Sequence, residues 1–431
     1  MSLEGAAGNG HRVAIGSNPE RNRSHNRRVV LDVVRLHGPI GRMRMAELAQ
    51  LTPQAVANIV DELVAERLLV EVGRLRRGRG QPPIQFAVNP DGPVTIGVEI
   101  AADHLVTVAL DLAGGLRGQR ITPLAATNPA IVVPKVAAEI AGMEAALARA
   151  ERAGAGDRVG EVEILGVGVV MPGPFGIEGM TSVGPTTLAG WDGAEPAAEI
   201  GAVVGHAVVV ENDATAAAIG ERLFGAGRNL QTFCLLYFGA GLGLGLIADG
   251  RPYRGAFGNA GEIGHAVVAP GGRACQCGQR GCLEQYASVH ALRERLAERS
   301  VAAPDAAALA RLLETGDPIL AAWIAEAAAH LAPMIATLEN ILDPETIVFG
   351  GVLPDALTDA LVAALEPLPV SVASRRERAL PRVVRGQTGQ LTAALGAASL
   401  PVFDTLTPKL DTVRAAAASP ATRQEEGRPR R

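Results

Sequence analysis

Several short apolar runs in this chain end abruptly in glycines or carboxylates, and this pattern limits the fold more than any other feature. Ile164–Val170 leads into Met-Pro-Gly-Pro, and Phe233–Phe238 and Thr346–Phe349 lead into glycines. Ala207–Val210 instead leads into Glu211-Asn212-Asp213-Ala214. Buried strands of this kind, with helices between them, indicate an α/β fold whose ligand cleft lies at the strand ends.

Composition supports this fold class and excludes several others. The 431 residues are 48% hydrophobic and 20% charged, which excludes a mostly disordered chain. Aromatic residues make up only 3%, and 51 glycines and 28 prolines favour α/β architecture over an all-β sandwich. No signal-peptide core precedes residue 29, and no run of about 18 apolar residues occurs. We therefore expect a cytoplasmic protein without a membrane partner.

A compact basic segment precedes the α/β part. Its periodicity predicts three helices and then two strands, over Arg27–Leu36, Met43–Leu48, a helix capped by Thr52 with Pro53 at its first position, Leu68–Val72 and Ile84–Val88. This is the order of a winged helix-turn-helix domain, which we expect over residues 25–90. Gln50 stands where the turn of such a domain usually has glycine.

The polar residues of this segment are placed to contact DNA. Thr52, Gln54, Ala55 and Asn58 begin the third helix, where Gln and Asn can pair bidentately with adenine. The loop between the strands would be a wing whose arginines neutralise phosphates; these are Arg74, Arg76, Arg77 and Arg79. With 13 arginines and 8 acidic residues, the first ninety residues carry +5, so the rest carries −10 of the total −5. The alternative is a small structural domain with a solvated arginine loop.

Three of the four cysteines lie within eight residues. Cys275, Cys277 and Cys282, with His265 upstream, form a four-ligand set that suits tetrahedral zinc. No fifth ligand or open position is evident, so we expect a structural zinc ion. The alternative is a group of free core cysteines beside an unrelated histidine. Cys234 lies in a buried strand and is interpreted as a small apolar residue.

These motifs together resemble the ROK family of repressors, open reading frames and sugar kinases. The resemblance rests on Glu262-Ile263-Gly264-His265 followed by the Cys-x-Cys-Gly-x-x-Gly-Cys-x-Glu stretch ending at Glu284. Glu211–Ala214, Gly239–Gly243 and Ile347–Gly351 match the family in the same order, over roughly residues 25–400. The N-terminal segment matches the layout of its repressor branch.

The resemblance implies a two-lobed, actin-like ATPase fold of the ribonuclease H-like type, with a sugar between the lobes. We expect a first lobe over residues 91–214, a second lobe with the zinc loop over 215–402 whose last helix packs on the first lobe, and disordered ends over 1–24 and 403–431. The implied sugar ligands are Asn212, Asp213, Glu262, His265 and Glu284. Asp213 would occupy the general-base position of the kinases. Its alternative role by itself is a helix N-cap, which does not exclude ligand binding.

Three departures separate this chain from the family's kinases. Their Gly-Gly-Thr phosphate turn is replaced by Ala101-Ala102-Asp103, in which Asp103 would repel a phosphate. Ala240 replaces a hydroxyl residue in the second phosphate loop. Thr187 replaces an asparagine that contacts sugar, which leaves the identity of the sugar open.

The sequence therefore predicts a sugar-responsive transcriptional regulator, a repressor of carbohydrate-use genes, and no catalytic residue. We expect a homodimer, or a dimer of dimers, on a palindromic double-stranded operator, with hinge motion over Pro82–Pro90. One alternative is an ATP-dependent sugar kinase that carries an accessory DNA-binding domain. Another is a regulator that responds to a protein partner and keeps a vestigial sugar site.

Overall fold

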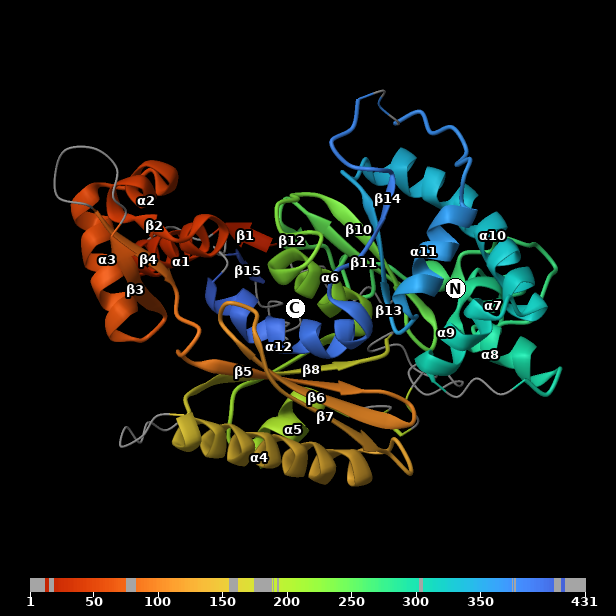
Figure 1. Ribbon diagram of the computed structural model, residues 1–431, viewed down its shortest axis with the longest axis horizontal. Coiled ribbons are helices and arrows are strands. Elements are labelled where there is room, and N and C mark those ends of the chain that lie inside the picture. The colour runs from red at the N-terminus through yellow and green to blue at the C-terminus, as the bar shows by residue number, and fades with distance from the viewer. Residues whose placement is uncertain are drawn as a thin grey trace, which may run out of the picture.

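The computed structural model describes residues 12–14, 19–74, 83–154, 162–173, 188, 190–191, 194–301, 305–373, 375, 377–406 and 412–414. Two five-stranded sheets form separate lobes, and a small domain at one side carries a three-stranded sheet (Figure 1). The α/β fold class is thus confirmed.

The first lobe is a mixed sheet in the order β7-β6-β5-β8-β9. Its strands are β5 (Val94–Ile100), β6 (His104–Asp111), β7 (Leu116–Pro123), β8 (Ile164–Met171) and β9 (Val208–Asn212). β5, β6 and β7 form an antiparallel meander, whereas β8 and β9 run parallel to β5. Helices α4 (Pro129–Gly154) and α5 (Pro196–Val204) cover one face of this sheet (Figure 1).

The second lobe repeats this topology. Its sheet order is β12-β11-β10-β13-β14, with an antiparallel meander followed by two parallel strands. The strands are β10 (Phe233–Phe238), β11 (Leu242–Ala248), β12 (Arg251–Pro252), β13 (Ile347–Gly351) and β14 (Val383–Arg385). One face of this sheet packs against α7 (Glu284–Ala287), α8 (Val289–Ala297), α9 (Ala306–Glu314), α10 (Pro318–Leu342) and α11 (Asp355–Ala364).

Helices α6 (Asp213–Phe224) and α12 (Thr392–Leu406) lie between the two sheets (Figure 1). Glycines let the backbones approach closely here. A Cβ on Gly220 would lie 3.2 Å from Cα of Gly396 on α12, and one on Gly245 of β11 would lie 2.3 Å from the Ala214 carbonyl oxygen on α6. On the first sheet, a Cβ on Gly168 would lie 1.8 Å from the Ala397 carbonyl oxygen. α12 therefore packs against the sheet of the first lobe.

The N-terminal domain is a winged helix. It contains α1 (Pro19–His37), α2 (Arg42–Ala49), α3 (Pro53–Ala65) and a sheet in the order β2-β4-β3, with β2 at Ile40–Gly41, β3 at Leu69–Arg74 and β4 at Ile84–Val88. Thr52 caps α3, since its Oγ1 accepts a hydrogen bond from the Ala55 N–H at 3.2 Å. Gln50 adopts the left-handed conformation (φ 53°), which is the geometry that glycine usually supplies in this turn.

The structure corrects the expected disordered ends where it describes them. α1 begins at Pro19 because Arg23 and Arg27 form ion pairs with Glu62 and Glu66 of α3, which fix the added turns. α12 continues to Leu406, and β1 (Arg12–Ala14) pairs with β15 (Thr412–Arg414).

In place of a phosphate loop over all of Gly239–Gly243, the structure has β11 beginning at Leu242, where its glycines make room for α6. Within the expected hinge over Pro82–Pro90, residues 84–88 form β4, which pairs with β3 inside the winged helix. The motion expected of this segment stays a prediction.

One helix, α10, is long and apolar enough to match a membrane span by length and composition. Trp323, Leu331 and Ile335 along it are fully buried in the core of the second lobe. The buried core helix of a globular domain meets the same criteria.

Candidate functional site

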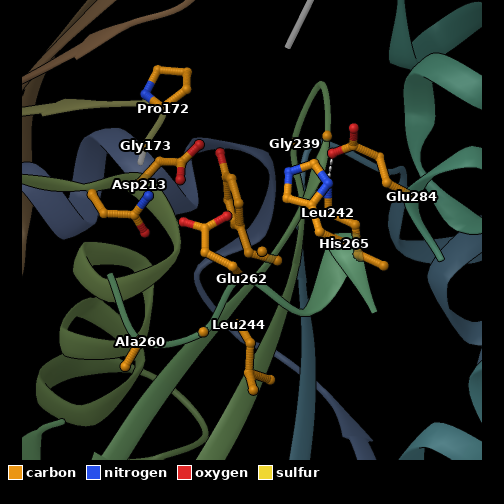
Figure 2. A pocket seen from close by; sticks show the side chains of 15 residues that line it. Pro172, Gly173, Asp213, Gly239, Leu242, Leu244, Ala260, Glu262, His265 and Glu284 are labelled. Atoms are coloured by element: carbon orange, nitrogen blue, oxygen red, sulfur yellow. Dashed lines mark hydrogen bonds between the residues drawn. The ribbon is translucent and has the colours of Figure 1, made fainter. Parts of the chain in front are cut away.

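A cavity at the strand ends brings together all five residues predicted to bind sugar. Asn212, Asp213, Glu262, His265 and Glu284 line it. They come from distant parts of the chain: the end of β9, the start of α6, the loop around the short helix Ile263–His265, and the start of α7. Figure 2 shows Asp213, Glu262, His265 and Glu284 pointing into the same space.

Local hydrogen bonds fix these side chains in position. Asn212 is the N-cap of α6, and its Oδ1 accepts from the N–H groups of Ala214 and Thr215 at 3.0 and 3.1 Å. Asp213 is the first residue of α6, so the N-cap is Asn212 and not Asp213. Glu284 is buried, and its Oε2 accepts from the Leu242 N–H at 3.2 Å (Figure 2).

The cavity is acidic, and burial disfavours the charged forms of its carboxyl groups. Burial, together with the nearby Glu262 carboxylate, raises the pKa of Asp213 to about 7. Burial and the Asp213 charge likewise raise the pKa of Glu99, which lines the adjoining larger cavity, to about 8. Near neutral pH, such carboxyl groups can accept or donate hydrogen bonds, which suits polyhydroxylated ligands.

A second, larger cavity of about 650 Å³ opens from the first. Pro172, Asp213, Tyr237 and Gly239 line both, so the two form one continuous cleft between the lobes. Its wall includes the turn Ala101–Asp103, whose Ala101 N–H is already bonded to the His104 carbonyl oxygen at 3.0 Å. The Asp103 carboxylate lies 2.5 Å from Nδ1 of His104. This turn therefore presents a carboxylate, and not a free glycine backbone, to the cleft.

Two cleft residues are missing from the sequence-based prediction. The Tyr237 hydroxyl donates to Glu99 Oε1 at 3.5 Å, and both residues line the larger cavity. Tyr237 carries the one hydroxyl group of the apolar strand β10, and Glu99 is the one charged residue of β5. A polar group inside an apolar strand is the sequence signal that would have found them.

The predicted metal ligands converge beside this cavity. The ligand atoms of His265, Cys275, Cys277 and Cys282 all lie within 4.8 Å of one another. Cys275 Sγ is 3.6 Å from His265 Nδ1, and Cys277 Sγ is 3.6 Å from Cys282 Sγ. Tetrahedral ligands bound at 2.0–2.3 Å stand about 3.5–3.8 Å apart, so the set fits a zinc-sized ion.

The backbone of this loop needs its glycines. Gly278 and Gly281 have φ values of 87° and 85°, and a Cβ on Gly281 would lie 1.7 Å from the Ala269 carbonyl oxygen. Cys234 stands apart in β10, where burial raises the pKa of its thiol to about 12. It is thus an apolar core residue, as predicted.

On the winged helix, the start of α3 is exposed as expected. Thr52, Gln54 and Asn58 are exposed and Ala55 is half-buried. Gln54 Nε2 donates to Asn58 Oδ1 at 3.0 Å, so the two amides share one face of the helix. Arg74 ends β3, but its side chain lies outside the described residues, as do the remaining wing residues Arg76, Arg77 and Arg79 and the departure at Thr187.

Comparison with known proteins identifies the family. The sequence profile of the ROK family matches residues 96–402. A xylose repressor from Bacillus spizizenii is 28% identical over 68% of this chain and 73% of its own length. The DNA-binding transcriptional dual regulator NagC of Escherichia coli is 26% identical over 87% of this chain and 91% of its own. A glucokinase from Streptomyces coelicolor is 30% identical over 71% of this chain and 97% of its own.

A solved structure agrees with the fold. A ROK family transcriptional regulator that is a homologue of the E. coli MLC protein matches 90% of this chain and 98% of its own, with a TM-score of 0.68 and 22% identity. NagC and this solved regulator thus match more of the chain than the glucokinase does, whereas the xylose repressor matches a similar share.

Proposed function

The chain belongs to the ROK family, and we propose that it is a transcriptional repressor whose affinity for its operator is set by a sugar. One observation carries this proposal: a winged helix and a polar cleft suited to hydroxyl ligands are joined in one chain. NagC and the solved homologue of the MLC protein match 87% and 90% of the chain, which is more than the ROK domain alone, whereas the glucokinase spans 71%. The names of the relatives make D-xylose and D-glucose the first sugars to test.

We assign the sugar to the smaller cavity. Asn212, Asp213, Glu262, His265 and Glu284 would bind its hydroxyl groups, because carboxylates and amides can each bond to two neighbouring hydroxyls. His265 turns Nδ1 towards Cys275, so Nε2 remains available to the sugar while Nδ1 binds metal. His265 would therefore connect the metal loop to the ligand.

The metal that we propose is one structural zinc ion. Zinc is the usual occupant of a four-ligand set of one histidine and three cysteines. Bound zinc would hold the loop that carries His265 and precedes Glu284. All four positions would be filled by protein ligands, so no catalytic role follows.

An ATP-dependent sugar kinase with an accessory DNA-binding domain is the alternative. Asp213 lines the cleft where a kinase would place its general base. The turn Ala101–Asp103 favours the regulator, because the carboxylate of Asp103 would repel a polyphosphate and Ala101 already uses its N–H within the turn. The chain is therefore proposed to bind sugar without phosphorylating it.

We further propose that the repressor binds DNA as a homodimer, or as a dimer of dimers, on a palindromic operator. Two winged helices would then meet half-sites about one helical turn apart, or a multiple of it. Gln54 and Asn58 would contact base edges, and Thr52, Ala55 and the wing arginines Arg74, Arg76, Arg77 and Arg79 would contact the remaining bases and the phosphates.

Sugar binding should weaken as the solution becomes acidic. A hydroxyl that donates to Asp213 needs the carboxylate, and the pKa of Asp213 is raised to about 7. Because protonation competes with this hydrogen bond, affinity should be full above pH 8 and fall by up to about tenfold per pH unit below 7. Isothermal titration calorimetry with D-xylose and D-glucose between pH 6 and 8.5 measures this pH dependence of the sugar affinity. Asp213→Asn is the control and should bind weakly with a flat profile. A wild-type affinity that does not change over this range would contradict the assignment of Asp213.

A further inference from the structure

Hydrogen bonds of one buried arginine, Arg35, join the winged helix directly to the second lobe, and we call this contact the Arg35 tie. Arg35, on α1, is only 6% exposed, and its Nη1 donates to the Leu223 carbonyl oxygen at 3.1 Å. Nη2 of Arg228, which follows α6, donates to the Arg35 carbonyl oxygen at 2.8 Å. Asp32 orients the guanidinium through contacts of 3.1 and 2.8 Å. The tie is favourable because a cation meets the free carbonyl groups at the C-terminal end of α6.

A separate contact, made by Arg117 and called the Arg117 tie below, joins the winged helix to the first lobe. The chain leaves β4 and enters β5 through residues 89–93. Arg117, on β7, donates to the Pro90 carbonyl oxygen and lies 3.3 Å from the Asp91 carboxylate. Its Nε is held at 2.9 Å by Asp111, a buried carboxylate of β6. The same small domain therefore touches both lobes through different residues.

Helix α6 leads from the sugar cavity to the Arg35 tie. Asp213, its first residue, lines the cavity, and the Leu223 carbonyl group in its last turn accepts from Arg35. Its twelve residues span about 18 Å. Residues 214–223 are all buried, so the helix is packed on every side. A displacement at Asp213 would therefore be carried to Leu223 by a rigid element.

The C-terminal end of α6 is also fixed to the loop that leads into α12. Glu221 is fully buried, and its carboxylate accepts from the N–H groups of Ala226, Gln387 and Thr388 at 2.6–2.8 Å. Gln387 and Thr388 belong to the loop that leads into α12, and α1 packs against α12. The end of α6 and α1 therefore share contacts with the same part of the lobe interface.

We propose that Arg35 is a positioning residue that couples the sugar cavity to the DNA-binding domain. Movement of the two lobes upon sugar binding shifts the Arg35 tie relative to the Arg117 tie, and the winged helix turns because it is held at both. This inference rests on the proposed function and adds the route by which that function is regulated. It predicts that loss of the tie lowers the sugar response and not the binding of either ligand by itself.

The test compares operator affinity with and without sugar for matched variants. The DNA is a duplex selected by the wild-type chain from a random pool, and the sugars are D-xylose and D-glucose. The ratio of the two Kd values for DNA measures the coupling, which is about 5- to 150-fold in typical allosteric proteins. Arg35→Met removes both the charge and the hydrogen bond. Arg228→Ala removes only the bond to the Arg35 carbonyl group, from an exposed position with little risk to folding.

Arg27→Met is the matched control. Arg27 lies on the same helix, but Glu62 and Glu66 of α3 hold it inside the winged helix. We expect the ratio to fall to within about twofold of one in Arg35→Met and by about five- to tenfold in Arg228→Ala. Arg27→Met should keep the wild-type ratio, whatever it does to DNA affinity. Calorimetry should find sugar affinity unchanged in all three.

The outcomes distinguish a failure of this inference from a failure of the proposed function. If the wild type responds to sugar and Arg228→Ala responds equally, the coupling role of this tie is wrong, even where Arg35→Met fails to fold. If the wild type binds sugar and DNA but shows no change in DNA affinity, the proposed function itself fails. Equal losses of the ratio in Arg27→Met and Arg35→Met would assign the effect to general damage of α1 and would also overturn the inference.

Discussion

Removal of the metal is expected to destabilise the second lobe and to abolish sugar binding. The four ligand atoms lie within 4.8 Å of one another, and one of the four ligands, His265, also lines the sugar cavity. Structural zinc sites contribute about 10–16 kcal/mol in small peptides, so even a fraction of this lost on chelation should lower Tm by about 10 °C or more.

Differential scanning calorimetry and sugar titration, before and after chelation, measure both effects. Elemental analysis should find one zinc ion per chain. Cys282→Ser should behave like the chelated protein, whereas Cys234→Ala should keep its zinc because Cys234 lies in β10, away from the ligand cluster. A chelated protein that binds sugar with wild-type affinity would refute the scaffold role of the metal.

Loss of the two exposed amides of α3 is expected to remove most of the sequence specificity. Gln54 and Asn58 lie on one face, joined by a hydrogen bond of 3.0 Å. A bidentate contact to adenine discriminates by about 1–3 kcal/mol, so each substitution to alanine should weaken operator binding about 5- to 150-fold. The effects need not add, because the two side chains contact each other.

The measurement is a titration of operator and of scrambled duplex over a range of salt concentrations. Binding to the scrambled duplex and the salt slope should be unchanged in these variants. The comparison variant Arg77→Ala with Arg79→Ala should show the reverse, with a salt slope smaller by about two. Wild-type operator affinity in the Gln54→Ala, Asn58→Ala double variant would show that α3 does not read the bases.

The sequence predicted β8, β9, β10 and β13 because each is a short apolar run that ends in glycines or carboxylates. It did not predict β7, whose sequence LRGQRITP is largely polar, or the short strands β12 and β14. It failed where tertiary contacts decide the structure. The added turns of α1 depend on ion pairs with α3, which is about forty residues away. β11 begins inside the glycine run because Gly243 and Gly245 face Ala214 of α6, and only their missing side chains allow that approach.

The candidate sites also divide into residues that a local sequence pattern predicts and residues that only tertiary packing brings together. The spacing of the cysteines was sufficient to predict the metal cluster, because the ligands are close in sequence. The resemblance to the ROK family supplied the five cavity residues, which no local pattern joins. Neither source predicted Glu99, Tyr237 or Arg35, since their partners lie 138 and 188 residues away and depend on how the lobes and the winged helix pack.

The most direct test of the account is the operator Kd of the wild-type chain with and without D-xylose or D-glucose, with ATP consumption followed in the same samples. We predict that one sugar changes the Kd by about 5- to 150-fold, with no phosphorylation. An unchanged Kd, together with phosphorylation of the sugar at an enzymatic rate, would contradict the account and identify the chain as a kinase that carries a DNA-binding domain.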